Sequence, residues 1–256
     1  MTLSRVVARC LVVSLVALAI ACGSEAPARP ATAGGDTPVD AATAGSLSGQ
    51  VTFTGEAPRA APLPLRADPA CVAAAGPDIV SDAVLVGASG GVQNVFVYVK
   101  GGLDPEYSFP TPTDAVLLDQ AGCRYRPRVL GVQVGQPVET INSDDTLHNV
   151  HGMPTKNVEF NESQPVKGMR LTTVFTTPEV MVRFKCNVHS WMAAYVGVLP
   201  HPYFAVTAAD GSFSIPGLPP GTYTIEAWHE VFGTQTQQIT IGERESATVA
   251  FSFQAG

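Results

Sequence analysis

Short runs in which apolar and polar residues alternate recur along most of the chain, and glycines and prolines separate them. In one such run Val180, Val182, Phe184 and Cys186 share a parity, so we expect all four side chains on the buried face of one strand. The chain contains 24 glycines and 21 prolines, which is typical of frequent turns. No long amphipathic helical pattern occurs. The pattern therefore predicts an all-β protein.

The C-terminal part repeats the same alternation around two turn segments. Residues 207–211 turn into an alternating run at 212–215, and residues 219–221 turn into another at 222–227. Alternation bounded by turn residues predicts successive hairpin strands. Two similar runs lie far upstream, at residues 47–53 and 95–99.

Candidate chemistry gathers after the run that ends at Cys186. His189 and Met192 follow this cysteine at C-x2-H-x2-M spacing, and His148 lies upstream. One thiolate and two imidazoles suit copper in a trigonal plane, with a thioether sulfur as a weak axial ligand. Zinc accepts cysteine and histidine but makes no use of the methionine. A lone cysteine or methionine is most often a core residue, but four matching donors favour a copper site.

These motifs resemble those of the cupredoxins, and the short ligand loop is most similar to that of amicyanin. The resemblance covers roughly residues 113–199 and includes Asn142-x-Asp144 ahead of the first histidine. It departs from amicyanin at Ser190, where such loops usually carry proline. It implies a Greek-key β-sandwich with one mononuclear type 1 (blue) copper site. The ligands it implies are His148, Cys186, His189 and Met192.

The same resemblance assigns roles to residues around the ligands. Asn149 would brace the ligand loop by hydrogen bonds, and His189 would form the electron exit at a surface edge. Trp191 would contribute to a docking patch at that edge. His151 follows His148 by three residues, but we interpret it as a rim residue and not as a ligand.

Counting histidines limits the enzyme classes within copper chemistry. A multicopper oxidase needs many more histidine ligands than the five in this chain. A nitrite reductase type would place histidine directly after Cys186, where Asn187 stands. His201 and His229 lack ligand partners at suitable spacing, so we interpret them as structural or surface residues. We therefore expect an electron carrier that is not an enzyme.

The two C-terminal hairpin motifs, D-G-S-F-S-I and L-P-P-G-T-Y-T-I, resemble the carboxypeptidase regulatory-like, transthyretin-like β-sandwich. Since such a domain also needs the upstream runs, we expect a discontinuous sandwich from residues 47–104 and 200–254. The cupredoxin domain, residues 105–199, would be inserted between its strands, which is physically tolerated where the ends of a loop are close. Two sequential domains divided near residue 110 are the alternative.

The N-terminus has the features of an export signal. Arg5 and Arg9 precede an apolar run that is too short to span a bilayer, so residues 1–21 are expected to be a signal peptide. Residues 18–23 resemble a bacterial lipobox, which implies lipidation of Cys22 and a lipid-anchored protein on the periplasmic side, by default at the outer membrane. The alternative is an ordinary secretory signal. Residues 22–46 hold almost no large apolar side chain and predict a flexible tether.

Five cysteines occur in the chain. Once Cys10, Cys22 and Cys186 are assigned to signal, lipid and copper, Cys71 and Cys123 remain. An oxidising compartment favours a disulfide between these two, and two unpaired buried thiols are the alternative. The bond would join the expected host domain to the expected insert.

Charge narrows the choice of partners. Loss of residues 1–21 removes Arg5 and Arg9 and no acidic residue, which changes the net charge from −7 to −9. This argues against nucleic acid, which requires a basic surface, and allows a basic redox protein as partner. We expect the protein to carry single electrons between a donor and an acceptor redox protein. The alternatives are a module for copper delivery or sequestration, and a structural adhesion lipoprotein with a vestigial site.

Overall fold

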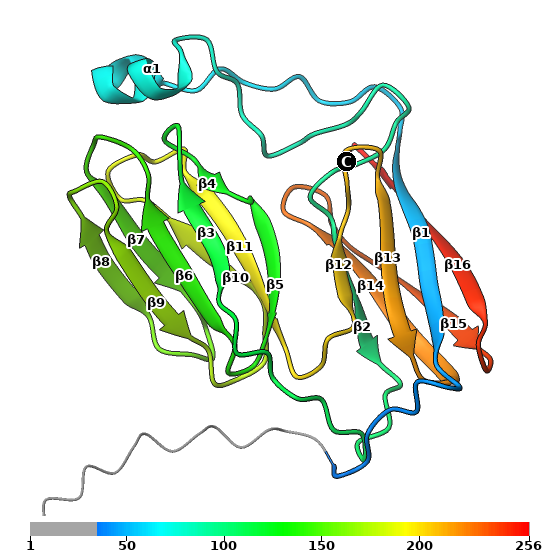
Figure 1. Ribbon diagram of the computed structural model, residues 1–256. Helices are drawn as coiled ribbons and strands as arrows, with labels where there is room; N and C mark the ends of the chain where they lie inside the picture. Colours follow the sequence, from blue (N-terminus) through cyan, green and yellow to red (C-terminus); the bar gives the residue numbers. More distant parts are fainter. Residues whose placement is uncertain (1–34, 256) are drawn as a thin grey trace, which may run out of the picture.

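Residues 35–255 are described by a computed structural model and form two β-sandwiches that lie side by side (Figure 1). The predicted signal peptide and the predicted lipidation site at Cys22 lie outside the described residues. Within residues 35–255, no helix is both long enough and apolar enough to cross a membrane. The fold is all-β, as the alternation predicts.

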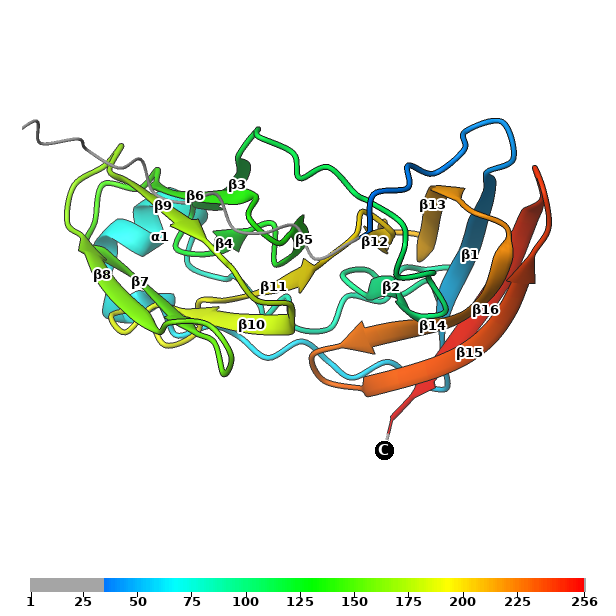
Figure 2. The same ribbon diagram turned by 90° about the horizontal axis from the view of Figure 1, so that it is seen from below.

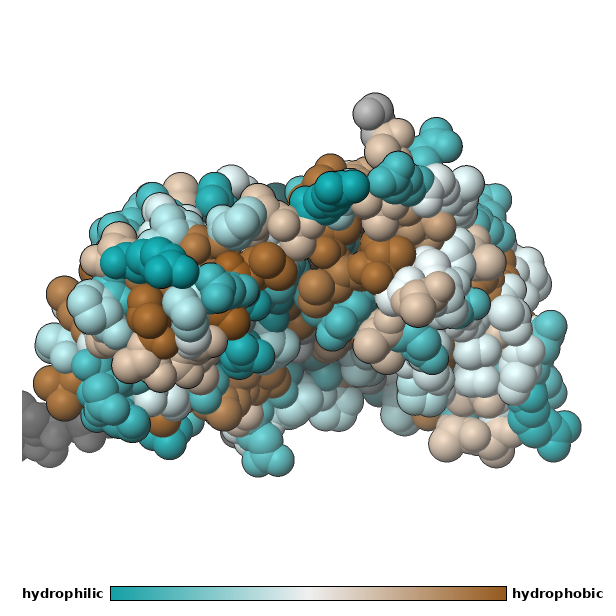
Figure 3. All heavy atoms as spheres, turned by 90° about the horizontal axis from the view of Figure 1, so that it is seen from above, coloured by the Kyte–Doolittle hydropathy of each residue, from teal (hydrophilic) through white to brown (hydrophobic). Residues whose placement is uncertain are grey.

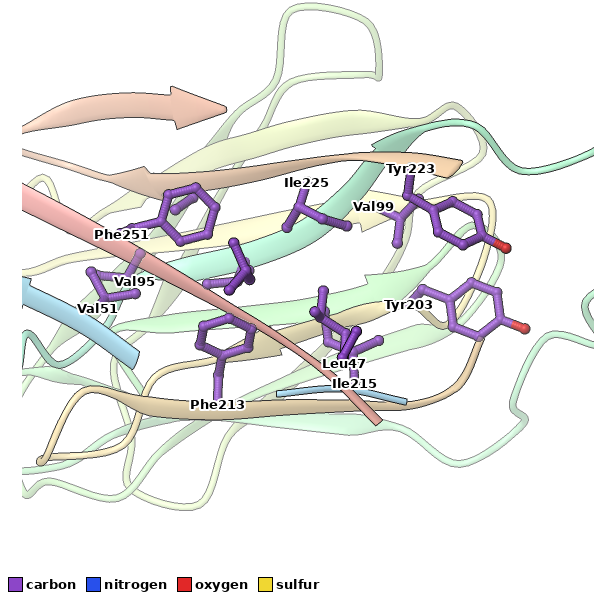
Figure 4. Packing of buried hydrophobic residues seen from close by; sticks show 14 of the residues in the cluster. Leu47, Val51, Val95, Val99, Tyr203, Phe213, Ile215, Tyr223, Ile225 and Phe251 are labelled. Atoms are coloured by element: carbon purple, nitrogen blue, oxygen red, sulfur yellow. The ribbon is translucent and has the colours of Figure 1, made fainter. Parts of the chain in front are cut away.

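One sandwich, called the host sandwich here, is built from both ends of the described chain. Its strands are β1 (Gly45–Thr54), β2 (Phe96–Gly101), β12 (Phe204–Val206), β13 (Ser212–Leu218), β14 (Gly221–His229), β15 (Gly233–Ile241) and β16 (Ser246–Gln254). They form the sheets β13-β1-β16 and β12-β2-β14-β15. Figure 4 shows apolar side chains of both sheets meeting between them, among them Leu47 and Phe213 from one sheet and Val99 and Ile225 from the other.

Each host sheet combines strands that precede residues 102–203 in the sequence with strands that follow them. β1 pairs in parallel with β16, and β2 pairs with β12, with Tyr98 opposite Phe204. Since β2 and β12 are antiparallel neighbours, the chain leaves the host sandwich and returns to it at one sheet edge. Residues 102–203 therefore emerge as a single large loop.

That loop contains the second sandwich, called the inserted sandwich here. Its strands are β3 (Val116–Gln120), β4 (Tyr125–Arg126), β5 (Val129–Gln133), β6 (Pro137–Asn142), β7 (His148–Met153), β8 (Phe160–Gln164), β9 (Arg170–Val174), β10 (Glu179–Lys185) and β11 (Ala193–Leu199). The sheets are β5-β11-β10-β7-β8 and β4-β3-β6-β9. Figure 2 shows the two sandwiches from below as separate layered bodies.

The alternation predicted for β10 holds only in its second half. Val182, Phe184 and Cys186 are buried, but Val180 is 37% exposed, so its predicted burial is wrong. Met181 has a φ of 63°, and the pairing with β11 is irregular between Glu179 and Val182. An extra residue in a strand reverses the parity of the side chains before it, and this bulge does so here.

Two neighbouring glycines allow the sandwiches to approach each other closely. Gly131 on β5 pairs with Gly197 on β11. A Cβ at Gly131 would lie 2.4 Å from the Phe204 ring, and a Cβ at Gly197 would lie 2.4 Å from the Phe96 ring. Phe96 and Phe204 stack with ring centroids 5.6 Å apart. The glycine pair thus provides the flat surface that these host rings cover.

A buried ionic cluster lies beside this interface. The Arg128 guanidinium of the inserted sandwich contacts Glu230 through Nε and through Nη2, the latter at 2.8 Å, and Nη1 lies 2.5 Å from Asp82 Oδ1. The side chains of Arg128 and Glu230 are only 10% and 9% exposed. Burial lowers the pKa of Arg128, but Glu230 and Asp82 outweigh it and raise the pKa above its ordinary value. The cluster therefore places the positive guanidinium of Arg128 between the carboxylates of Glu230 and Asp82.

Residues 62–80, called the strap here, leave the host sandwich after β1 and cross to the inserted sandwich (Figure 1). The strap contains a short 3-10 helix (Leu65–Ala67) and α1 (Pro69–Ala75), and a Pro62–Val80 bridge closes its base. Leu65 and Cys71 are fully buried in the core of the inserted sandwich. The strap falls within 47–104, which was assigned to the host domain, but its apolar side chains fill the open end of the other sandwich. Figure 3 looks onto this side, where hydrophobic residues concentrate near the middle.

The described end of the predicted tether is attached to the fold. Gly35 N donates to Pro105 O at 2.9 Å, Thr37 pairs with Tyr107, and Gly45 begins β1. The expectation of a free tether up to residue 46 is therefore wrong for residues 35–46. Backbone hydrogen bonds fix this part without large apolar side chains.

His229 makes the host sandwich sensitive to acid. It is buried, its Nδ1 accepts from Val231 N and Phe232 N, and burial lowers its pKa to about 4 from the ordinary 6.5. Between these pH values the unfolded chain binds a proton that the folded chain does not, so stability falls as the pH falls from 6.5 towards 4. We expect His229→Asn to reduce the proton uptake on unfolding at pH 5 by about one proton, as measured from the pH dependence of urea unfolding. An unchanged uptake would show that His229 is protonated in the fold.

Candidate metal centre

The four predicted ligands come together at the strap end of the inserted sandwich. His148 begins β7, Cys186 directly follows β10, and Met192 directly precedes β11. His189 lies in the loop between β10 and β11. The four side chains are between 0% and 2% exposed. The hairpin β10–β11 and the neighbouring strand β7 thus bring residues from two distant segments to one buried point.

Three donor atoms face one another at short distances. His148 Nδ1 lies 3.0 Å from His189 Nδ1, and Cys186 Sγ lies 3.9 Å from the same His189 Nδ1. The donor atoms of all three residues lie within 4.8 Å of one another. Met192 belongs to the same buried cluster as Cys186, and its backbone closes the loop by donating to His189 O and accepting from Cys186 N.

The charges in the centre favour a thiolate. Burial raises the pKa of the Cys186 thiol, but the neighbouring imidazoles of His148 and His189 outweigh burial and lower the pKa to about 5. Burial lowers the pKa of His148, but its hydrogen bonds to Asp144 and Cys186 raise the pKa to about 9. Near neutral pH the metal-free centre therefore holds a negative sulfur and a protonated imidazole. Metal ligation requires that thiolate and displaces the proton.

Asn149 makes the contacts expected of a bracing residue. Its Oδ1 accepts from Asn187 N at 3.1 Å, and its Nδ2 donates to Asn161 Oδ1 and to Glu162 O. Asn187 directly follows Cys186. The side chain of Asn149 therefore ties the ligand loop to β7 and β8.

Two carboxylates behind the histidines were not assigned any role from the sequence. Asp144 Oδ2 lies 2.9 Å from His148 Nε2, and Asp68 Oδ2 lies 2.9 Å from His189 Nε2. A carboxylate accepts hydrogen bonds, so both histidines carry a proton on Nε2 and direct Nδ1 towards Cys186. Asp144 is part of the quoted Asn142-x-Asp144 motif. For Asp68 the sequence offered only a helix-start pattern, an aspartate followed by proline, which predicts the N-cap of a helix and no contact with a histidine.

A disulfide joins Cys71 of the strap to Cys123 of the inserted sandwich, as the cysteine assignment expects. Both residues are fully buried. Cys71 Sγ lies only 3.5 Å from His189 Nε2. The bond therefore lies directly against the outer side of a predicted ligand.

The strap changes the expected role of the His189 edge. His189 is 2% exposed, so it does not form a surface exit, and that expectation is wrong in this structure. Asp68 and Cys71 cover the imidazole edge that would otherwise face solvent. Trp191 is half-buried, with Nε1 donating to Cys123 O at 3.0 Å. Its place in a docking patch stays a prediction.

The remaining histidines contribute no donor to the centre. His151 Nδ1 lies 3.2 Å from Asn187 Oδ1 and its Nε2 lies 2.6 Å from Glu159 Oε1, in keeping with a residue near the rim. His201 is buried in the host sandwich, where burial lowers its pKa to about 4. The donor set is thus one thiolate and two imidazoles beside a buried methionine, which fits a copper ion and gives a zinc ion no use for the methionine.

Comparison with protein-family models gives one partial match. Residues 193–254 match the family model of the carboxypeptidase regulatory-like domain. The match begins at the first residue of β11, a strand that the structure places in the inserted sandwich. No curated protein sequence matches the chain.

The solved structures that resemble the chain include an amicyanin, a purple cupredoxin and a copper-containing nitrite reductase. An oxidised mutant of amicyanin is 26% identical over 33% of this chain and 81% of its own, with a TM-score of 0.30. A purple cupredoxin from Nitrosopumilus maritimus is 27% identical over 29% of this chain and 81% of its own, with a TM-score of 0.26. A copper-containing nitrite reductase from Thermus scotoductus is 22% identical over 40% of this chain and 25% of its own, with a TM-score of 0.30.

Proposed function

We propose that this protein is a copper-containing electron carrier of the cell envelope. His148, Cys186, His189 and Met192 would hold one copper ion, which supplies a one-electron Cu(II)/Cu(I) couple when bound. The observation that carries the proposal is the convergence of His148 Nδ1, His189 Nδ1 and Cys186 Sγ within 4.8 Å in a buried centre. The donor set, and not the partial matches, supports it.

The surroundings of the donors support electron transfer over exchange of the metal. The strap and the disulfide cover the centre, and the four side chains are almost fully buried. A site for copper delivery would need ligands that a partner can reach. A rigid, water-excluding shell instead keeps the donors in place during a change of copper charge, which lowers the structural cost of the transfer.

The proposed contact with redox partners is the outer side of the ligand loop. Asn187 and Val188 lie between the buried residues Cys186 and His189, and both are exposed, Val188 to 47%. A partner that covers these two residues approaches the thiolate along the chain itself. We also propose that a lipid on Cys22 anchors the protein on the periplasmic side of a membrane.

The test is the visible spectrum of a soluble fragment that starts at Gly23 and is loaded with Cu(II). We expect an intense blue absorption from sulfur-to-copper charge transfer, which is lost completely in Cys186→Ala because no other free thiol lies in the described residues. Cyclic voltammetry should then show a reversible one-electron couple.

A matched control is His151→Ala, because His151 contacts the ligand loop without facing the donors. It should keep the blue absorption. A colourless fragment that retains only Cu(I) or zinc would refute the electron carrier and support metal handling.

A further inference from the structure

His189 is held from its outer side by a residue that the strap contributes. Asp68 Oδ2 lies 2.9 Å from His189 Nε2, and the imidazole is 2% exposed. The strap belongs to the connection between β1 and β2, two strands of the host sandwich. One contact to a predicted ligand therefore comes from outside the sandwich that carries all four ligands.

The Asp68 carboxylate is itself fixed by several donors. Its Oδ1 caps α1 by accepting from Ala70 N at 2.8 Å and Cys71 N at 3.4 Å. Its Oδ2 accepts from Thr146 Oγ1 at 3.3 Å in addition to His189 Nε2. Oδ1 thus accepts hydrogen bonds from the backbone of α1, and Oδ2 accepts hydrogen bonds from the side chains of Thr146 and His189. This arrangement leaves the carboxylate a single orientation.

The disulfide joins this support to its counterpart behind the other histidine. Cys71 N donates to Asp68, and Cys123 N donates to Asp144 Oδ2 at 2.7 Å. Asp144 in turn accepts from His148 Nε2. The two carboxylate–histidine pairs are therefore linked through one covalent bond, and the strap cannot lift away from His189 while the bond is intact.

We propose that Asp68 is a positioning residue of the copper centre, supplied by the strap, which fixes the tautomer and orientation of His189. The inference rests on the proposed function. By accepting a hydrogen bond from the protonated Nε2, Asp68 leaves Nδ1 directed towards Cys186 and His148. Carboxylates behind ligand histidines raise ligand basicity and fix the ring, and their loss typically weakens metal affinity 10- to 100-fold.

Two substitutions at Asp68 separate positioning from a merely structural role. Asp68→Ser keeps a good N-cap for α1 but is too short to reach His189. Asp68→Asn keeps the shape of the side chain, but its amide has only one acceptor oxygen. With that oxygen on the helix cap, the amide nitrogen faces His189 Nε2 and favours the proton on Nδ1, where the metal is to bind.

The first readout uses metal-free protein. Nitrogen-15 NMR spectra of the imidazoles show which ring nitrogen is protonated, and we expect Nε2 of His189 in the native protein. Asp68→Asn should move the proton towards Nδ1, and Asp68→Ser should leave a mixture of tautomers. Asp78→Asn, a substitution at an exposed strap carboxylate paired with Arg66, should change nothing.

The second readout is the rate at which a strong chelator removes Cu(II), followed by the visible spectrum. We expect release about 10- to 100-fold faster in both Asp68 variants than in Asp78→Asn. Native tautomer and native release in Asp68→Asn would overturn the inference. If even the native protein holds no copper, the proposed function fails, and the metal-free spectra still decide whether Asp68 positions His189.

Discussion

The double variant Cys71→Ser with Cys123→Ser is expected to lose about 4 kcal/mol of unfolding free energy. The disulfide spans 52 residues of sequence, and the chain-entropy model gives about 4 kcal/mol for closing a loop of this length in the unfolded state. Both sulfurs are fully buried, so the serine hydroxyls would also enter an apolar core. The loss should be visible as a lower midpoint in urea unfolding of the metal-free protein.

A suitable control is Cys186→Ser, which leaves the disulfide intact. Alkylation of free thiols followed by mass measurement would verify the state of each cysteine before unfolding. A loss below about 1 kcal/mol in the double variant would show that packing of Leu65 and its neighbours holds the strap without the bond. The double variant should also release Cu(II) faster, because the strap then lifts Asp68 from His189.

The second large effect is expected at the ionic cluster beside the interface. Arg128→Met keeps the length of the side chain but leaves Glu230 buried and Asp82 without its shortest ion pair. Removal of one partner of a buried ion pair typically costs about 3 to 5 kcal/mol, since an uncompensated charge remains in the interior. Chemical unfolding followed by circular dichroism would measure the change.

Two controls test this explanation. Arg66→Met removes an ion pair whose side chains are 74% and 84% exposed, and it should change stability by less than about 1 kcal/mol. Addition of Glu230→Gln to Arg128→Met should recover part of the loss, because it removes the stranded charge. A double variant that is no more stable than Arg128→Met would mean that the lost packing of the arginine, and not charge, causes the effect.

The sequence predicted the ligands well because their spacing is local. Cys186, His189 and Met192 lie within one short loop between two strands, so the fold has little freedom to separate them. His148 required a second inference, namely that the strand before it faces the same loop. The structure brings the donor atoms of His148, Cys186 and His189 together and buries Met192 in the same cluster as Cys186.

The strap could not be predicted, because its role depends on contacts distant in sequence. Residues 62–80 contain mostly alanine, proline and small polar residues without a regular period. Asp68 and Pro69 predict the start of a helix, but their sequence does not indicate which sandwich the helix covers. For the same reason the closed edge at His189 was missed, and the exit was expected where Asp68 and the disulfide lie.

Backbone irregularities formed the other limit. Alternation predicted the burial of Val182, Phe184 and Cys186, but Met181 adopts a positive φ that methionine rarely shows. The bulge therefore exposes Val180 without a signal in the sequence. The role of Gly131 and Gly197 could not be predicted either, because their pairing under two host rings follows only from the register of β5 and β11.

The single edge at which the chain leaves and re-enters the host sandwich constrains the order of folding. β2 and β12 must pair across residues 102–203, a loop on the order of a hundred residues. Closing it from the unfolded state costs about 3 kcal/mol more than closing a four-residue hairpin. Folding of the inserted sandwich removes that penalty, since it brings the end of β2 and the start of β12 together before these two strands pair. The host sheet that contains β2 and β12 is therefore expected to assemble late, on an insert that has already folded.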